Sequence, residues 1–235
     1  MIKLFKILLS LIVAPFRWVV ACIKRDRFRV YPGKVVQIIG LPGTGKTMAA
    51  HALMVRSAKM FDAKYATEDA GSKIAQKITL HDIGTHRFRR CLFLIDESSL
   101  NGLDAREWSG NFKGDRKNIL RQLKLVRHYH NAFITTSQSA GDNDSKVRGL
   151  SSSTWVAHSF FHAWIIVKRA VQWFEWQDGQ YLPHLDEPSV FEMICDPYSH
   201  IILRKKRWGK LYNSWATVSE LDVLPYFRSE DKKSS

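Results

Sequence analysis

Residues 40–47, which read GLPGTGKT, have the spacing G-x-x-x-x-G-K-[ST] of a loop that binds the phosphates of a nucleoside triphosphate. Glycine accepts backbone angles that other residues avoid, so successive amide N–H groups in such a loop can point at one anion. The Lys46 side chain would reach the β- and γ-phosphates, and the Thr47 hydroxyl would bind Mg²⁺. We therefore expect ATP and Mg²⁺ as cofactors. The residues expected to contact the nucleotide are Gly40, Pro42, Gly43, Thr44, Gly45, Lys46, Thr47 and Met48.

The elements expected on either side of this loop are a buried strand and a helix. Residues 35–39 are mostly β-branched, and residues 48–60 contain good helix formers. The amino-terminal end of such a helix carries partial positive charge, which favours bound phosphate. This order predicts an α/β P-loop NTPase domain of three layers, with helices on both faces of a mainly parallel central sheet. A glycine turn with a chance lysine is the alternative.

Two acidic residues, Asp96 and Glu97, directly follow a continuous apolar run at residues 91–95. A strand that is covered on both faces has this composition, and its carboxyl end would lie beside the phosphate loop. Asp96 would there help to hold Mg²⁺ through its water shell. Glu97 would act as the general base that polarises the attacking water. Because the pattern also occurs by chance, its position beyond the loop is what favours a site.

Gln138 and Arg148 are two further candidates for the catalytic site. Gln138 ends an apolar strand expected at residues 132–137, where it could contact both the γ-phosphate and the attacking water; capping of the strand is the alternative. Arg148 follows a short polar stretch, and we expect it to reach the phosphate of a neighbouring subunit, as arginine fingers do. Arg121 and Arg127 compete for this role. An arginine finger of this kind implies a homo-oligomer.

The segment at residues 4–23 is mostly apolar and is long enough to cross a bilayer as a helix. Lys6 and Arg17 interrupt it, so an amphipathic helix in the plane of the membrane surface competes with a spanning helix. A signal peptide is disfavoured because no convincing small-residue cleavage site follows, and a helix buried in a core is the remaining alternative. Four basic residues at positions 24–29 outnumber those before the segment, which predicts that the main domain faces the cytoplasm.

The composition favours a polyanionic partner. Lys and Arg number 36 against 22 Asp and Glu, a formal net charge of +14, which suits nucleic acid or an anionic membrane; a solvated basic surface is the alternative. The three cysteines have no metal-binding spacing. We divide the chain into a membrane-associated helix with a basic connector (residues 1–30), an ATPase domain (residues 31–228) and a disordered tail (residues 229–235).

Further elements are expected around these motifs. A second strand is expected near residues 64–66, and a helix with one basic side at residues 118–129. Beyond residue 148, aromatic and β-branched runs are separated by turn signals, which predicts strands or hairpins. These runs lie at residues 155–162, 163–169, 172–176 and 200–206.

The basic side of the helix at residues 118–129 is a candidate contact for DNA, together with a loop expected at residues 101–116. Contacts from Lys and Arg to phosphates give affinity without sequence readout, and aromatic side chains can stack on the bases of a single strand. A solvated face, anionic lipid and a neighbouring subunit are the alternative partners. The candidate residues are Lys113, Arg116 and Lys117 for phosphates, and Trp108 and Phe112 for bases.

Three stretches of the sequence resemble the zonula occludens toxin-like (Zot) assembly ATPases of filamentous phages: residues 40–47, 91–97 and 125–138. In that family an Arg-His pair precedes an apolar strand that ends in Thr/Ser-Gln, and an arginine follows a short loop.

Arg127-His128, Gln138 and Arg148 occupy those positions in this chain. Near the carboxyl end, the residues Leu-Tyr-Asn-Ser at positions 211–214 resemble the closing Leu-Tyr-x-Ser of the family. The resemblance covers roughly residues 33–218, which is most of the expected ATPase domain.

This resemblance implies a multimeric ATPase at the host inner membrane that powers the assembly and extrusion of single-stranded phage DNA, with phage coat or assembly proteins as partners. In the family the membrane segment commonly follows the ATPase domain, whereas here the apolar segment comes first. Two alternatives remain open: a genome-packaging ATPase of a membrane-containing virus, and a non-catalytic ATP-binding membrane scaffold. An intact Glu97 argues against the scaffold.

Overall fold

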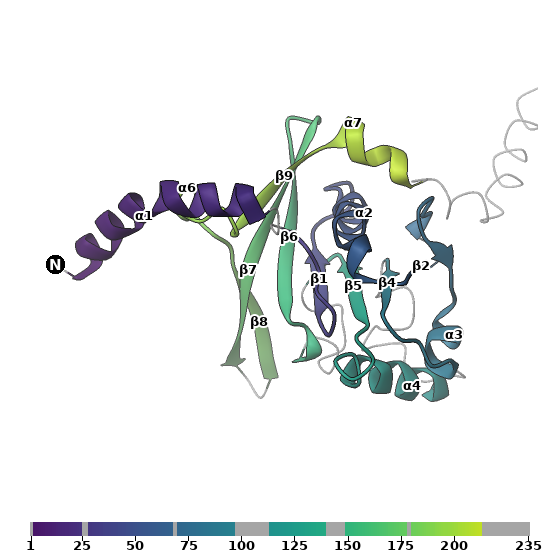
Figure 1. Ribbon diagram of the computed structural model, residues 1–235. Helices are drawn as coiled ribbons and strands as arrows, with labels where there is room; N and C mark the ends of the chain where they lie inside the picture. Colours follow the sequence, from purple (N-terminus) through teal and green to yellow (C-terminus); the bar gives the residue numbers. More distant parts are fainter. Residues whose placement is uncertain are drawn as a thin grey trace, which may run out of the picture.

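The computed structural model describes residues 2–24, 28–67, 70–96, 113–139, 149–177 and 180–212. A central sheet runs through the molecule with helices on both of its faces, and a helix at the amino terminus, α1 (Ile2–Lys24), lies beside the last strands (Figure 1). The residues named above between 97 and 112, and between 140 and 148, lie outside the described part of the chain.

Six strands form the parallel part of the sheet, in the spatial order β3-β2-β4-β5-β1-β6. The strand β5 lies between β1 and β4, so the carboxyl ends of these three strands meet at one edge of the sheet. This mainly parallel sheet confirms the predicted fold class. The six strands are β1 (Val35–Ile39), β2 (Ala63–Ala66), β3 (Gln76–Lys77), β4 (Cys91–Ile95), β5 (Ala132–Ser137) and β6 (Ser153–Phe160).

The strands β1, β4 and β5 are buried along their whole length. The strand β4 is apolar on both faces, whereas β1 and β5 also bury polar side chains, namely Gln37, Thr135, Thr136 and Ser137. Because side chains alternate between the faces of a strand, Leu92 and Leu94 pack into the core under α2 (Lys46–Ser57), whereas Phe93 packs on the opposite side. That opposite core lies against α3 (Leu80–Thr85) and α4 (Lys113–Lys124). Figure 1 shows α2 on one face of the sheet and α3 and α4 on the other.

An antiparallel extension continues the sheet beyond β6. The long strand β7 (Trp164–Gln177) pairs over its first half with β6 and β9 (His200–Arg204), and over its second half with β8 (Gln180–Asp186). The two strands expected at residues 163–169 and 172–176 are therefore one strand, because no turn residue separates them. The sequence did not predict β8, which contains Pro183 and lies at the end of the strand order, where proline is tolerated.

Two predicted helices have different bounds in the structure. The helix after the phosphate loop is α-helical as far as Ser57 and ends in a 3₁₀ turn, Ala58–Met60. The helix expected at residues 118–129 corresponds to α4, which ends at Lys124. It begins at Lys113, inside the segment that was expected to be a loop. Residues 125–130 form turns because the chain must reverse before β5, and His130 there has a positive φ of 53°.

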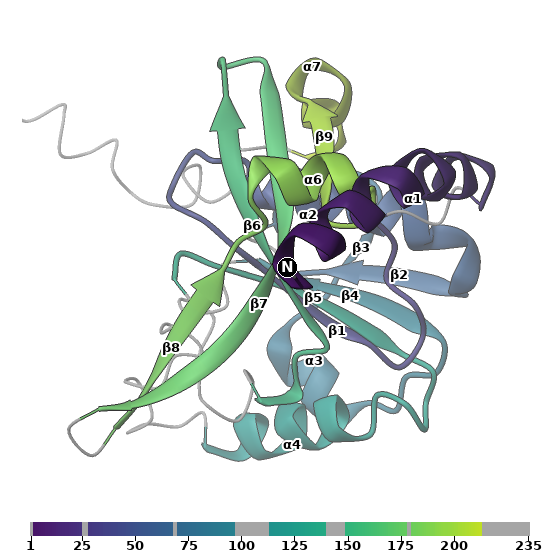
Figure 2. The same cartoon turned by 90° about the vertical axis from the view of Figure 1, so that its left-hand side faces the viewer.

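The amino-terminal helix α1 forms where the sequence predicts a helix, and Pro15 lies inside it. It lies next to the short helix α6 (Val190–Cys195), as both views of the molecule show (Figures 1 and 2). The Trp18 indole N–H donates a hydrogen bond of 2.8 Å to the carbonyl of Ile194. Among the helices of the described residues, none is both long and apolar enough to cross a membrane, so the expected spanning helix has no support there.

Asn131 connects the starts of two strands. Its side chain, 1% exposed, accepts a hydrogen bond from the Cys91 amide and donates one to the Phe88 carbonyl, each of 2.9 Å. Its backbone carbonyl accepts a third from the Gly33 amide, at 2.7 Å. Asn131 therefore ties the segments that lead into β1 and β4 to the start of β5.

We predict that Asn131→Ala destabilises the protein by about 1–3 kcal/mol, because it leaves the buried Cys91 amide and Phe88 carbonyl without partners. Chemical denaturation measures the change. The matched control is Gln76→Ala, which removes an exposed amide side chain and should change stability by less than about 0.5 kcal/mol. Equal unfolding midpoints for Asn131→Ala and the wild type would contradict the assigned role.

Candidate functional site

The glycine-rich loop lies at the carboxyl end of β1, and two of its glycines are required by close packing. A Cβ atom on Gly40 would lie 2.7 Å from the Ala157 carbonyl oxygen. Gly45 has a φ of +94°, and a Cβ there would lie 2.1 Å from the Ile165 side chain. The loop is therefore seated tightly against β6 and β7, and only glycine fits at these two positions.

The helix α2 starts directly from this loop, at Lys46. Its N-cap residue, Gly45, has no side chain to cap those groups, and the first turn holds no acidic residue. Unpaired amides at a helix start form an anion-binding site. The chain thus presents backbone N–H groups, rather than a carboxylate, where the phosphates of a nucleotide would lie.

Lys46 and Thr44 both point back into the loop. The Lys46 ammonium, on a side chain that is largely buried, donates to the Leu41 carbonyl at 3.2 Å, and the Thr44 hydroxyl donates to the same oxygen at 2.8 Å. The Leu41 carbonyl therefore receives hydrogen bonds from groups that can also donate to phosphate oxygens. A bound phosphate would offer these donors a charged acceptor in place of this carbonyl, and hydrogen bonds to an anion are stronger.

Asp96 lies beside Thr47, and this contact brings together the two residues predicted to hold Mg²⁺. The Thr47 hydroxyl donates to one carboxylate oxygen of Asp96 at 2.8 Å, and the Thr136 hydroxyl donates to the other at 2.5 Å. Asp96 is only 3% exposed, and its amide donates to the Thr67 hydroxyl. Hydroxyl and carboxylate oxygens are the ligands that Mg²⁺ prefers, so the donor set fits the ion.

The other predicted catalytic residues differ in what the structure says about them. Gln138 is exposed and follows β5; because Ile39 pairs with Ser137, Gln138 comes next to the start of the glycine loop. The backbone thus places it at the same edge as Asp96, and its catalytic role stays a prediction. Glu97 and Arg148 lie outside the described residues, so their roles also stay predictions.

The two competitors for the arginine finger lie away from the loop. Arg121 is on α4, on the face of the sheet opposite to α2. Arg127 lies near Gly33, where an added Cβ would come within 3.1 Å of its side chain. Gly33 precedes β1, at the other end of that strand from the loop. Within one subunit, neither arginine is therefore positioned at its own nucleotide site.

Thr136 and His51 contribute to the site but were not singled out from the sequence, and Tyr212 was noted there only as part of the closing motif. The His51 ring, fully buried on α2, donates through Nδ1 to the Thr47 carbonyl at 2.7 Å and stacks on Tyr212, with 5.2 Å between ring centroids. Burial lowers the pKa of His51, although its hydrogen bond to the Thr47 carbonyl opposes this shift. Burial is also the main cause that raises the pKa of Tyr212, and the charge of Asp96 raises it further.

Tyr212 belongs to the closing Leu-Tyr-x-Ser motif, so that motif contacts the helix that follows the phosphate loop. The Lys73 amide donates to the Leu211 carbonyl at 2.9 Å, and Tyr212 forms an isolated β-bridge with Ser72. The family resemblance was the only sequence signal for this residue, because Tyr212 is far from the loop in the chain. Residues 213 and 214 lie outside the described part.

No protein-family model matches the sequence, and no curated protein sequence matches it. The structure is similar to the N-terminal domain of zonular occludens toxin from Neisseria meningitidis, with a TM-score of 0.50 and 15% sequence identity, over 77% of this chain and 100% of that one. A weaker similarity is to the genome packaging NTPase B204 of Sulfolobus turreted icosahedral virus 2 in complex with sulfate, with a TM-score of 0.42 and 12% identity over 68% of this chain and 99% of that one. Another is to the RadB recombinase, with a TM-score of 0.44 and 12% identity over 59% of this chain and 81% of that one.

At these identities the similarity concerns the fold. Together with the glycine loop at the end of β1, the helix that starts from it and the Thr47–Asp96 contact, it establishes that this chain has a Zot-like P-loop NTPase fold.

Proposed function

We propose that this protein is an ATPase that uses ATP hydrolysis to power the assembly and extrusion of a filamentous phage and its single-stranded DNA. The observation that carries the proposal is the contact of Thr47 with Asp96 beside a loop that holds Lys46, because this arrangement can bind a triphosphate and Mg²⁺ together. The Mg²⁺ ion would neutralise charge on the phosphates. The Thr47 hydroxyl and the water shell held by Asp96 would keep it in place.

In the proposed mechanism, each of the chain's own groups has one role. Lys46 and the amides at the start of α2 bind the phosphates, and Thr136 fixes the orientation of the Asp96 carboxylate. Glu97 accepts the proton of the attacking water, and Gln138 responds to loss of the γ-phosphate. Arg148 of a neighbouring subunit in a homo-oligomer stabilises the transferred phosphoryl group.

Two observations support the role in phage assembly. The Arg-His to Gln stretch at residues 127–138 and the closing motif resemble Zot-like ATPases, and the fold is similar to the N-terminal domain of zonular occludens toxin. The net charge of +14 suits a nucleic-acid partner. The phage coat or assembly proteins that such a machine would engage are part of the proposal.

We further propose that the protein attaches to the cytoplasmic side of the host inner membrane through α1, lying in the plane of the surface. Several apolar side chains of α1 are exposed, with exposed fractions of 75% for Ile12 and 70% for Phe16. Leu11 and Val19 are also exposed, and Arg17 on the same helix suits anionic head groups. The exposed apolar side chains support attachment because they would leave water on contact with lipid.

The first prediction concerns nucleotide binding. Saturating Mg²⁺–ATP should raise the thermal unfolding temperature of the wild type, because at 100 times Kd a ligand stabilises the folded state by about 2.7 kcal/mol. Lys46→Ala should lose most of this shift, since it removes the charge that meets the phosphates. The control is Lys59→Ala, on the exposed 3₁₀ turn after α2, which should keep the shift. An undiminished shift in Lys46→Ala would contradict the site.

The second prediction concerns hydrolysis. Glu97→Gln should keep the thermal shift with Mg²⁺–ATP and lose turnover by about 10²-fold or more, because it removes the general base and preserves shape. Steady-state phosphate release measures this loss. Unchanged turnover would remove Glu97 from the mechanism.

The third prediction concerns the arginine finger. Arg148→Ala and Lys46→Ala should each be inactive alone, but a mixture of the two should recover part of the activity. In mixed oligomers an Arg148→Ala subunit has an intact loop that can receive the finger of a Lys46→Ala neighbour. Phosphate release from mixtures at several ratios measures the recovery. A mixture as inactive as its components would show that Arg148 does not act across a subunit boundary.

The fourth prediction concerns the membrane. The wild type should float with vesicles that contain anionic lipid, and Ile12→Asp together with Phe16→Asp should abolish flotation, since two carboxylates oppose insertion of the apolar face. Val55→Asp, an exposed apolar position on α2, is the control and should still float. Flotation of the double variant would contradict attachment through this face.

A further inference from the structure

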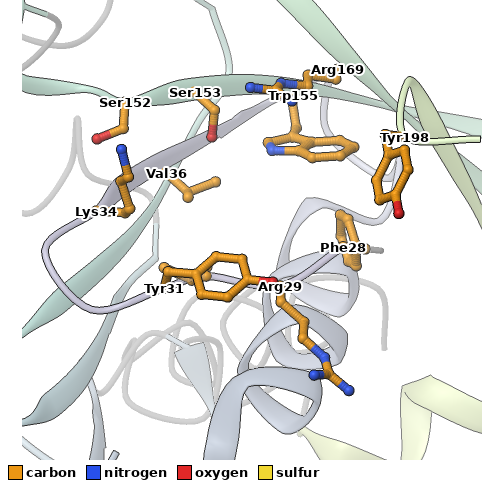
Figure 3. Close-up of a pocket in the computed structure, with 11 residues that line it drawn as sticks. Phe28, Arg29, Tyr31, Lys34, Val36, Ser152, Ser153, Trp155, Arg169 and Tyr198 are labelled. Atoms are coloured by element: carbon orange, nitrogen blue, oxygen red, sulfur yellow. The ribbon is translucent and has the colours of Figure 1, made fainter. Parts of the chain in front are cut away.

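A cavity of about 250 Å³ lies at the end of the sheet opposite to the glycine loop. Lys34 and Val36 line it from the start of β1, whereas the loop follows the end of that strand. Its other walls come from the start of β6, from β7, and from the segments that precede β1 and β9. Figure 3 shows that these side chains surround a common space. The cavity is therefore separate from the nucleotide site described above.

Aromatic side chains form much of this cavity. Phe28 and Trp155 meet edge to face, with ring centroids 5.1 Å apart, and are 5% and 8% exposed. They make a fixed wall. Tyr31, on another side of the cavity, is 45% exposed and so presents a ring to solvent. An exposed ring opposite a fixed aromatic wall suits a flat, conjugated ligand.

Cationic side chains line the same space, and no carboxylate of the described residues lines it beside them. One of these cations, Arg169, also lines a neighbouring cavity together with four acidic residues, Asp186, Glu187, Glu192 and Asp196. Arg169 pairs with Trp155 across the β6–β7 ladder and lines the cavity with Lys34. Among the described residues, no salt bridge joins either cation to a carboxylate, and no acidic residue lines the cavity. The Lys34 ammonium points toward the Ser152 hydroxyl (Figure 3), and Ser153 adds a second hydroxyl. The surroundings thus suit an anion that accepts hydrogen bonds.

We propose that this cavity binds one nucleotide of a single-stranded nucleic acid, with the base on the aromatic side chains and the phosphate near Lys34 and Arg169. The inference deepens the proposed function, on which it rests for the identity of the strand as phage DNA. A ligand that is flat at one end and anionic at the other matches both halves of the cavity. Base pairs of a duplex keep their faces stacked on one another, so a duplex would not fit.

The cavity and the glycine loop are linked by one strand. The five residues of β1 are all buried and are hydrogen-bonded on both sides, to β5 and β6. Lys34 directly precedes this strand and Gly40 directly follows it. A strand held on both sides moves as a unit, so the two sites lie at the two ends of one rigid element. This arrangement suits a machine in which a nucleotide-driven change has to reach a bound strand.

The test measures binding of a fluorescein-labelled oligo(dT) strand to the full chain without ATP, by anisotropy, over a range of salt concentrations. Tyr31→Ala should weaken binding about 10-fold, and Trp176→Ala, an exposed aromatic at the far end of β7, should not. The logarithm of the affinity falls as the logarithm of the salt concentration rises. Lys34→Gln and Arg169→Gln should each make this slope shallower by about 0.7, and Lys59→Gln should leave it unchanged. Thermal unfolding of each variant checks that it is folded.

A cross-linking arm locates the strand. An oligonucleotide that carries 5-iododeoxyuridine should cross-link on irradiation to peptides that contain Tyr31 or Trp155, and Tyr31→Ala should reduce the yield. Cross-links confined to other peptides, or unchanged affinity in Tyr31→Ala, would overturn the proposal. Equal affinity for duplex DNA, or competition by free thymidine monophosphate as strong as by the oligonucleotide, would also overturn it.

Lys46→Ala separates this inference from the proposed function. Because the cavity lies at the other end of β1, Lys46→Ala should bind the oligonucleotide as the wild type does, and loss of binding would contradict an independent site. If the wild type binds the strand but never hydrolyses ATP, the proposed function fails while the cavity assignment stands. If it hydrolyses ATP and Tyr31→Ala binds DNA normally, only the cavity assignment fails.

Discussion

The structure depends above all on the carboxylate of Asp96, which is buried and held by two hydroxyl groups. Thr47 reaches it from the phosphate loop and Thr136 from the neighbouring strand, so three segments converge on one charge. A buried carboxylate is costly unless it is hydrogen-bonded or meets a cation. The two hydroxyl donors offset part of this cost. Asp96 comes beside Thr47 because β4 and β1 are parallel and end at one edge of the sheet, with β5 between them.

Packing around the loop imposes a second constraint. Gly45 has a positive φ, and a Cβ added to it would collide with Ile165. A Cβ added to Gly40 would collide with the backbone of β6 at Ala157. The strands β6 and β7 therefore act as a rigid support for the loop as well as an extension of the sheet. The same two strands supply Trp155 and Arg169 to the cavity at the other end. The paired strands β6 and β7 thus serve both the proposed nucleotide site and the proposed strand-binding site.

Much of the fold was predictable from local patterns, and the failures have physical causes. The continuous apolar run at β4, the β-branched run at β1 and the run at residues 132–137 predicted strands of a mainly parallel sheet, and these strands are confirmed. The strand β8 was missed because Pro183 contradicts ordinary strand propensity, which an edge position tolerates. The predicted end of α4 at residue 129 was wrong, since the helix ends at Lys124. The chain reverses before β5, at His130, although the helical pattern continues in the sequence. In each case a tertiary constraint outweighed local preference.

The sequence by itself determined the glycine loop, its strand and helix, and the position of Asp96 after an apolar strand, because residue type and spacing alone encode local backbone geometry. Only the tertiary structure decided which distant groups meet. Thr136 reaches Asp96 because β5 lies beside β4, and Tyr212 stacks on His51 because the last described segment returns to α2. The cavity likewise combines Tyr31 with Trp155 and Arg169 from separate segments. Such meetings depend on strand order, which local periodicity does not specify.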